Sequence, residues 1–259
     1  NPHLLPQYGF GRGYDTFYDS NSEPSKLARL RQWVKDTLDQ DGILYKGLEK
    51  AFATGETQVG FNPGTPFVPA DELTDRAIEW AEGAEKGPRF MWIHYMDVHH
   101  PYLPPEEHQL AFRSEPVGER RAVKLRRKML ESPDEITEAE LETLINLYDG
   151  EIRFFDTEVE RLIREVEAAW DSEPVIVFTS DHGDEFLDHG QFSHYGTMYE
   201  ELLHVPVFIR DAESGGAYDD IVELLDLAPT ILEYANAPIP DSYEGVSFRR
   251  ILDGGSKDK

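Results

Sequence analysis

The sequence predicts an α/β fold in which helices cover both faces of a mostly parallel central sheet. Short apolar runs at 89–97, 174–180 and 205–211 are typical of strands that are buried on both faces. Amphipathic segments, such as 71–84 and 148–168, alternate with these runs. Strands that alternate with helices favour a parallel sheet between two helical layers.

The individual helices are predicted from apolar spacing and from the residues at their ends. Residues 25–39 and 71–84 have helical spacing, and 71–84 begins with acidic side chains that favour a helix N-terminus. In 148–168, one apolar face consists of Ile152, Phe155, Val159 and Leu162.

Two further regions are expected to be helical but interrupted by proline. Residues 106–147 are charged and predict an excursion over the sheet edge, with a second helix that starts at Pro133. Residues 219–235 predict a helix pair that breaks before Pro229, because the residue before a proline avoids the helical conformation.

The composition is strongly acidic and excludes several kinds of partner. Asp and Glu total 51 against 25 Lys and Arg, which gives a net charge of −26. General affinity for nucleic acid or for an anionic membrane requires basic patches, so neither is expected. An acidic excess along the whole chain suggests a surface adapted to high salt, where screening removes self-repulsion. We therefore hypothesise a halophilic source.

Features that the sequence lacks exclude further kinds of site and of protein. There is no cysteine, so neither a disulfide nor a thiolate metal site is possible within it. No apolar run approaches the ~20 residues that span a bilayer. No signal peptide opens the sequence, which favours the cytoplasm, although the opening reads as mid-domain sequence and leaves the compartment open.

Chemically capable residues follow two of the predicted strands. Asp97-Val98-His99-His100-Pro101-Tyr102 follows the run at 89–97, and Asp181-His182-Gly183-Asp184 follows the run at 174–180. Binding sites in open α/β sheets lie beyond the carboxyl ends of the strands. Both segments are therefore candidate parts of a site.

The second segment predicts a metal site. Asp181 and His182 are adjacent and can ligate one ion where Gly183 permits a sharp turn. A carboxylate-rich set with one imidazole suits Ca²⁺, Mg²⁺, Mn²⁺ or Zn²⁺. The alternative is an acidic surface loop. His189 and His194 follow in a glycine-rich stretch that can bring both rings towards one point.

Several of these residues have a plainer interpretation. His100 competes with His99 for any role at the strand end, and the register with Pro101 and Tyr102 favours His99. His189 is interpreted as a loop-stabilising residue, and His94 as a packed core residue. Asp97, Tyr102, Asp184 and His189 are candidates for an outer layer that orients the histidines, with solvated carboxylates as the alternative for the two aspartates.

The motifs together resemble the sulfatase family within the alkaline phosphatase superfamily. The segment PVIVFTSDHGDEFLDHGQFSHYGTMYEELLHVPVFIR resembles the family's strand, Ser-Asp-His/Asn-Gly and His-Gly pattern. MWIHYMDVHHPYLPP, LYDGEIRFFDTEVERLI and LLDLAPTILEYANAPIPDSYEGVSF resemble three other family segments, and NPHLLPQYGFGRGYDTF resembles the segment after the nucleophile. The five segments occur in the family's order.

The resemblance implies roles for individual residues. Asp181 and His182 would be ligands of a single divalent metal, usually Ca²⁺. His194 would contact the sulfate oxygens, and His99 would contact the sulfate or protonate the leaving oxygen. His3 would match another sulfate-contacting histidine, and Asn1 a position that is often lysine.

The resemblance also implies a part that these residues do not contain. The family nucleophile is a Cys or Ser, converted to formylglycine, in Cys/Ser-x-Pro-x-Arg, and neither this motif nor the family's upstream pair of metal-binding aspartates is found. Residues 1–253 are thus expected to form a sulfatase-like domain without its nucleophile-bearing part, which could be a separate chain. Residues 254–259 read as a flexible tail.

The resulting functional hypothesis is a sulfuric ester hydrolase that acts on a sulfated small molecule or glycan. One alternative is phosphorus chemistry on the same scaffold: phosphonate or phosphodiester hydrolysis, or phosphoethanolamine or phosphoglycerol transfer. Another is a non-catalytic metal-binding member or subunit. The substrate, the ion and the oligomeric state stay open at this point.

Overall fold

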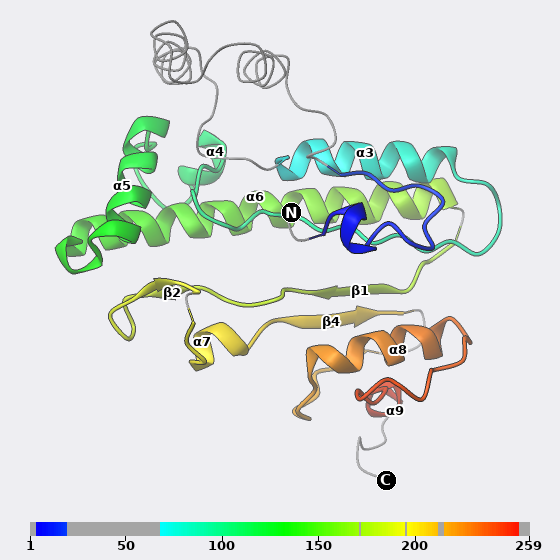
Figure 1. Cartoon of the computed structure of the whole chain (residues 1–259). Helices are drawn as coiled ribbons and strands as arrows, with labels where there is room; N and C mark the ends of the chain where they lie inside the picture. Colours follow the sequence, from blue (N-terminus) through cyan, green and yellow to red (C-terminus); the bar gives the residue numbers. More distant parts are fainter. Residues whose placement is uncertain (1–3, 20–67, 171, 195, 212–214, 254–259) are drawn as a thin grey trace, which may run out of the picture. The chain divides into compact units, whose positions relative to one another are not determined.

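The computed structural model describes residues 4–19, 68–170, 172–194, 196–211 and 215–253 (Figure 1). The chain forms two compact units, and each is described by itself. Unit 1 comprises Asn1–Lys128 and Thr137–Ile163, and unit 2 comprises Met129–Ile136 and Arg164–Lys259. The predicted helix at 25–39 and the predicted tail at 254–259 lie outside the described residues.

Helices make up the regular structure in the described part of unit 1. They are η1 (Pro6–Tyr8), α3 (Ala70–Gly83), α4 (Glu106–Gln109), α5 (Glu119–Glu131) and the start of α6 (Glu138–Trp170), the last two of which continue into unit 2. Helix α3 confirms the helix predicted at 71–84. The helix predicted at 148–168 is confirmed as part of the longer α6.

The start of α6 differs from the prediction. Pro133–Glu135 forms only a single 3-10 turn, η2, and α6 begins at Glu138. The backbone N–H of Glu140 donates to Thr137 Oγ1 at 3.3 Å, and the backbone N–H of Thr137 donates to Glu140 Oε2 at 3.0 Å. This reciprocal pair is a capping box, which satisfies two backbone donors at once and therefore sets the helix start.

Helices α3 and α6 pack together within unit 1. Arg161 Nη1 of α6 lies 2.7 Å from Asp75 Oδ1 of α3, and Nη2 donates to the carbonyl of Asp71 at 3.2 Å. The buried apolar side chains of the unit come from both helices, from α5 and from the intervening loops: Ala70, Ala77, Ala81, Tyr102, Val117, Ala122, Leu125, Leu144, Leu147 and Phe154. Burial of these groups provides most of the stabilising free energy of the unit.

The predicted central strand at 89–97 is not confirmed, because the structure forms no strand there. Tyr95 holds the segment by its side chain: its hydroxyl lies 2.8 Å from Thr74 Oγ1, and its ring packs edge-on against Phe155 at 5.1 Å. Phe90 and Trp92 are 58% and 48% exposed. A run of apolar residues predicts burial, but a strand also requires a hydrogen-bonded neighbour.

Unit 2 contains two short antiparallel sheets. Strand β1 (Ile176–Thr179) pairs with β4 (Val207–Arg210), and β2 (Glu185–Phe186) pairs with β3 (Phe192–Ser193). Phe178 and Phe208 are directly opposite in the β1–β4 register, and their rings stack at 4.9 Å. The strands predicted at 174–180 and 205–211 are therefore confirmed as elements, but their predicted burial is wrong: β1 is half-buried and β4 is mostly exposed.

The direction of this pairing differs from the predicted parallel sheet. A parallel pair requires a crossover connection of a dozen or more residues, usually an α-helix. Between β1 and β4 the chain instead forms the β2–β3 hairpin and the four-residue helix α7 (Glu200–Leu203). Apolar runs mark the strands but carry no information on direction, so a mostly parallel central sheet is not confirmed in the described residues.

The C-terminal helices correct the break predicted at Pro229. The 3-10 turn η3 (Leu224–Asp226) leads directly into α8 (Leu227–Tyr234), and α9 (Arg249–Leu252) follows. Pro229 lies in the first turn of α8, where backbone N–H groups have no helical acceptor, so the missing donor costs nothing. The buried Asp226 carboxylate accepts the backbone N–H groups of Glu223 and Val246 at 2.9 and 2.8 Å.

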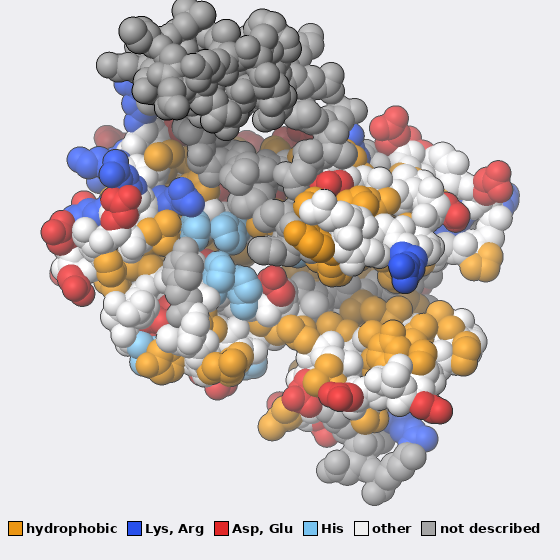
Figure 2. Space-filling view, in the orientation of Figure 1, with side chains coloured by type: hydrophobic (Ala, Val, Ile, Leu, Met, Phe, Trp, Pro, Cys, Tyr) orange, Lys and Arg blue, Asp and Glu red, His pale blue; other side chains and the backbone are white. Residues whose placement is uncertain are grey.

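The surface mixes acidic and hydrophobic side chains, as Figure 2 shows in red and orange. Ile221 and Met198 are the most exposed large hydrophobic residues described, at 85% and 82%. Helix α6 has 33 residues, but charged side chains recur along it. In the part of the chain that the structure describes, no helix combines the length and the apolar character needed to cross a membrane.

Candidate functional site

The segment after β1 brings a histidine and two aspartates close to α7. Gly183 is the residue that permits this approach: a Cβ there would lie 2.0 Å from the carbonyl oxygen of Glu201. Its backbone N–H donates to the carbonyl of Leu202 at 3.0 Å. Glycine is required because the two backbones are in contact, so the turn between His182 and Asp184 is fixed by α7.

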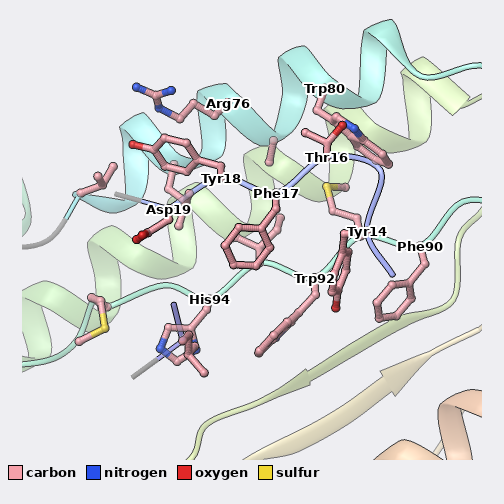
Figure 3. Close-up of a pocket in the computed structure, with 17 residues that line it drawn as sticks. Tyr14, Thr16, Phe17, Tyr18, Asp19, Arg76, Trp80, Phe90, Trp92 and His94 are labelled. Atoms are coloured by element: carbon pink, nitrogen blue, oxygen red, sulfur yellow. The ribbon is translucent and has the colours of Figure 1, made fainter. Parts of the chain in front are cut away.

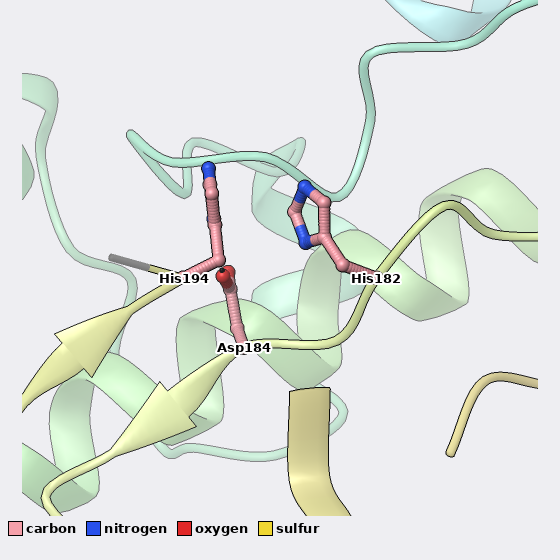
Figure 4. A group of neighbouring side chains, drawn as sticks. All are labelled: His182, Asp184 and His194. Atoms are coloured by element: carbon pink, nitrogen blue, oxygen red, sulfur yellow. Dashed lines mark hydrogen bonds and ion pairs between the residues drawn. The ribbon is translucent and has the colours of Figure 1, made fainter. Parts of the chain in front are cut away.

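His182, Asp184 and His194 form a compact cluster in unit 2 (Figure 4). One ligand atom from each lies within 4.8 Å of the others. The imidazole rings of His182 and His194 are 3.9 Å apart between centroids. His194 follows β3, and Asp184 precedes β2, so the short hairpin places these two side chains next to each other.

Hydrogen bonds fix the orientation of both rings. His182 Nδ1 lies 2.8 Å from the carbonyl oxygen of Gly183. A carbonyl can only accept, so Nδ1 carries the proton and the neutral ring has its lone pair on Nε2. His194 Nδ1 lies 3.0 Å from Asp184 Oδ1 and 3.0 Å from Ser193 Oγ. A carboxylate at Nδ1 is the usual way in which a protein orients a functional imidazole.

Asp181 lies at the edge of this cluster. Its side chain is 69% exposed, and its Oδ1 accepts the backbone N–H of His182 at 3.1 Å. Oδ1 also lies 3.7 Å from His182 Nε2. Two ligands that each lie about 2.0–2.6 Å from one ion can be this far apart. The pair, with the lone pair of His182 on Nε2, is therefore compatible with a divalent metal.

Next to this cluster lies a second group, of which only His189 is singled out by the sequence. It consists of Glu185, His189 and Glu201, with one ligand atom of each within 4.8 Å of the others. His189 Nδ1 lies 2.7 Å from Glu201 Oε1, and the His189 ring stacks on Tyr199 at 3.5 Å. The spacing Glu-x-x-x-His at 185–189 is the only local signal for it, because Glu201 is distant in sequence.

Glu185 gives this group a structural role. It is 1% exposed, and its Oε1 accepts the backbone N–H groups of His189 and Gln191 at 2.8 and 3.0 Å. These bonds close the loop between β2 and β3, in which Leu187 has a φ of 69° and Gly190 a φ of 81°. His189 contributes its backbone N–H to this loop, and its side chain bonds to Glu201, so its interpretation as a loop-stabilising residue stays a prediction.

The other predicted histidines lie in unit 1, on the loop after the 89–97 segment. His99 is half-buried, and its Nδ1 lies 2.7 Å from the carbonyl oxygen of His100, which leaves the lone pair of the neutral ring on Nε2. His100 is 4% exposed, and its Nδ1 accepts a hydrogen bond from Arg126 Nε at 3.2 Å. The peptide bonds Asp97–Val98 and His100–Pro101 are cis.

Two carboxyl groups near this loop have raised pKa values. Burial raises the pKa of Asp97 to about 6, although its Oδ1 accepts the backbone N–H of Ala70 at 3.2 Å. Burial, and then the charge of Asp97, raises the pKa of Glu151 to about 8. The Tyr102 side chain is 3% exposed and packs edge-on against Tyr148.

A cavity elsewhere in unit 1 has several aromatic side chains in its walls (Figure 3). Its volume is about 240 Å³, and its walls include Tyr14, Phe17, Trp80, Phe90 and Trp92. His94 also lines it and packs against Trp92, in keeping with a packing role. None of the predicted site residues that the structure describes lines this cavity. His3 lies outside the described residues.

A family model and a curated relative point to the same family. The family model described as Sulfatase matches residues 1–237. An arylsulfatase of Clostridium perfringens (strain 13 / Type A) is 36% identical over 113 residues, which cover 41% of this chain and 23% of that protein.

Two solved structures show a similar fold. The phosphonate monoester hydrolase of Agrobacterium radiobacter has a TM-score of 0.60 at 23% identity, over 90% of this chain and 52% of that one. BT4656, solved in complex with its substrate D-glucosamine-2-N,6-O-disulfate, has a TM-score of 0.56 at 20% identity, over 73% of this chain and 53% of that one. The matched region thus spans about half, or less, of each of these three proteins.

Proposed function

Because the chain belongs to the sulfatase family, we propose that the complete protein hydrolyses sulfuric esters with the help of one divalent metal. The observation that carries the proposal is the pair Asp181 and His182, whose Oδ1 and Nε2 atoms lie 3.7 Å apart with the lone pair of His182 on Nε2. This is the pair of side chains that the family motif assigns to the metal. Asp181 and His182 would hold the ion, which would lower the pKa of the nucleophile and polarise a sulfuryl oxygen.

The identity of the ion is part of this proposal. We favour Ca²⁺, with Mg²⁺, Mn²⁺ and Zn²⁺ as the alternatives. Asp181 supplies the hard oxygen ligand that Ca²⁺ prefers, whereas the imidazole of His182 suits the softer ions as well. Competition binding among the four ions would decide between them.

Two histidines are proposed to act on the substrate. His194, oriented through Nδ1–H by Asp184, would in its protonated form donate from Nε2 to the sulfate oxygens and stabilise the charge that develops on them. His99, whose Nδ1–H is held by the carbonyl of His100, would in its protonated form donate from Nε2 to the departing oxygen. Asp97 and Tyr102 are proposed to support the His99 loop, and His189 to support the β2–β3 loop. His3 is proposed as a further sulfate contact.

The nucleophile and the architecture are further parts of the proposal. We propose a formylglycine made from Cys or Ser in a Cys/Ser-x-Pro-x-Arg motif that this sequence does not contain. It would be supplied by an N-terminal part of the same domain, on the same or a separate chain. Residues 1–253 would belong to one α/β domain with a mostly parallel central sheet. The family match over 1–237 and the likeness to the phosphonate monoester hydrolase support this.

The substrate class is proposed to be a sulfated small molecule or glycan. Support comes from the arylsulfatase relative and from the glucosamine disulfate bound by BT4656. The same groups would suit a phosphonate monoester or phosphodiester, and the similarity to a phosphonate monoester hydrolase keeps that alternative open. A transferase of phosphoethanolamine or phosphoglycerol, and a non-catalytic metal-binding member, are the remaining alternatives.

The test compares hydrolysis of an aryl sulfate with that of an aryl phosphonate and an aryl phosphate by the complete protein. We expect the sulfate to be preferred, and Asp181→Asn or His182→Ala to reduce both metal affinity and kcat/KM by at least about 10-fold. The matched control is Asp188→Asn in the neighbouring loop between β2 and β3, which should leave metal affinity and kcat/KM unchanged. Preference for the phosphonate would replace the sulfatase assignment, and metal binding without turnover of any ester would indicate the non-catalytic alternative.

A further inference from the structure

The loop that carries His99 is attached to a single turn of α6. The backbone N–H of Leu103 donates to Glu151 Oε1 at 2.5 Å. The preceding residue, Tyr102, is buried against Tyr148, which lies three residues before Glu151 on the helix. These contacts fix the C-terminal end of the loop a few residues from His99.

Gly150 adds a third contact on the same helical turn. A Cβ at this position would lie 2.8 Å from Pro104 Cγ and 3.6 Å from Gln109 Cα. The loop therefore lies against the helix backbone, with no space for a side chain between them. Gln109 holds the next stretch of chain, because its amide donates to the carbonyl of Pro104 at 2.9 Å and accepts the backbone N–H of Val117 at 2.8 Å.

The other end of the loop is also attached. Asp97 Oδ1 accepts the backbone N–H of Ala70 at the start of α3, at 3.2 Å. Inside the loop, the backbone N–H of His99 donates to the carbonyl of Met96 at 2.8 Å. The His99 ring is thus set by the path of the main chain from Asp97 to Pro104, and Glu151 is the side chain of α6 that bonds to this path.

We propose that Glu151 is a positioning residue for His99: it holds the loop through the Leu103 N–H so that the imidazole is presented in one orientation. This inference rests on the proposed function only in that His99 would act on the leaving group. Glu151 is 6% exposed, so its bond to the Leu103 N–H is made away from solvent. Its raised pKa keeps it mainly protonated at neutral pH, so a glutamine is a close mimic.

The first test is kinetic and uses the complete protein with an aryl sulfate. Glu151→Ala should lower kcat by about 10- to 100-fold, the cost of a misplaced catalytic group, with KM within about threefold. Glu151→Gln retains the acceptor and should stay within about threefold of the unchanged protein. In the double variant Glu151→Ala/His99→Ala, kcat should be no lower than in His99→Ala alone, because Glu151 acts through His99.

Two further variants separate positioning from general damage. Gly150→Ala should lower kcat as well, because its Cβ displaces Pro104, although alanine is otherwise the better helix residue. Glu160→Ala, at an exposed position of the same helix, is the matched control and should leave kcat and KM unchanged. The proposal would be overturned if Glu151→Gln lowered kcat as much as Glu151→Ala does. It would also be overturned if the effects of Glu151→Ala and His99→Ala on kcat were multiplied in the double variant.

The second test does not depend on turnover. The imidazole ¹⁵N resonances of His99, assigned with His99→Ala, should shift in Glu151→Ala and Gly150→Ala but not in Glu151→Gln or Glu160→Ala. Unchanged His99 resonances in Glu151→Ala would overturn the inference even in an active enzyme. If the complete protein hydrolyses no ester while these resonances shift as expected, the proposed function fails and the positioning role stands.

Discussion

The buried carboxyl groups of Glu151 and Asp97 make the stability of unit 1 depend on pH. The pKa of Glu151 is about 8 in the fold against an ordinary 4.5, and that of Asp97 is about 6 against 3.8. A carboxyl group with a higher pKa in the fold binds its proton more tightly there, so protonation favours folding. The stabilisation by Glu151 is complete below about pH 4.5 and is lost as the pH rises to about 8, whereas that by Asp97 is lost by about pH 6.

We therefore expect the free energy of unfolding to fall between pH 6 and pH 8 by an amount that Glu151→Gln removes. One pKa unit corresponds to about 1.4 kcal/mol, so the difference should be a few kcal/mol at most. Urea unfolding at constant salt would measure it, with Glu160→Gln as the control for loss of an exposed carboxylate. Parallel pH dependences in the two variants would show that Glu151 is not the group responsible.

At the scale of elements, α6 depends on its first turn. Thr137 and Glu140 cap the helix reciprocally, and Glu140 Oε2 also lies 2.6 Å from Lys128 Nζ of α5. Thr137→Ala should destabilise the protein by about 1 kcal/mol through loss of the cap. Thr157→Ala is the control within the same helix, where alanine is the better helix former and little change or a slight gain is expected. Thermal unfolding of both variants would check this, and equal melting temperatures would contradict it.

The same elements show how far sequence patterns predict this structure. Helix α3 and strands β1 and β4 follow from local spacing and composition, because each is determined mainly by its own residues. Pro133 predicts an earlier helix start than the structure has, whereas the Thr-x-x-Glu pattern at 137–140 marks the observed start of α6. The pairing direction of β1 and β4, and the absence of a strand at 89–97, depend on partners distant in the chain, which spacing does not encode.

The residues of the candidate site likewise include some that the local sequence predicts and others that it does not. Asp181, His182 and Asp184 could be named because they follow a strand-like run, and His194 because it ends the same glycine-rich stretch. Glu201 and Glu151 could not, because each reaches its partner only through folding: Glu201 from α7 to His189, and Glu151 from α6 to Leu103. An isolated glutamate on a helix carries no local sign of burial.

At the scale of the whole molecule, charge is the dominant feature. The net charge is −26, so repulsion between the acidic side chains opposes folding at low ionic strength. At 1 M salt the Debye length is about 3 Å, and this repulsion is largely screened. On the hypothesis of a halophilic source, the melting temperature should rise clearly from low to molar KCl. A flat or falling profile, compared with a sulfatase of near-neutral net charge as the control, would remove the hypothesis.

The main-chain bonds of His182 and His99 have a consequence for how the protein tolerates sequence change. Each ring is held by a carbonyl of the following residue, a partner that every amino acid supplies. No single substitution of a neighbouring side chain deletes that partner, whereas His194 relies on Asp184, which one nucleotide change can abolish. In a saturation screen for activity we would thus expect position 184 to be restricted by its bond to His194, whereas Gly183 and His100 would be restricted only by packing and not by their bonds to His182 and His99.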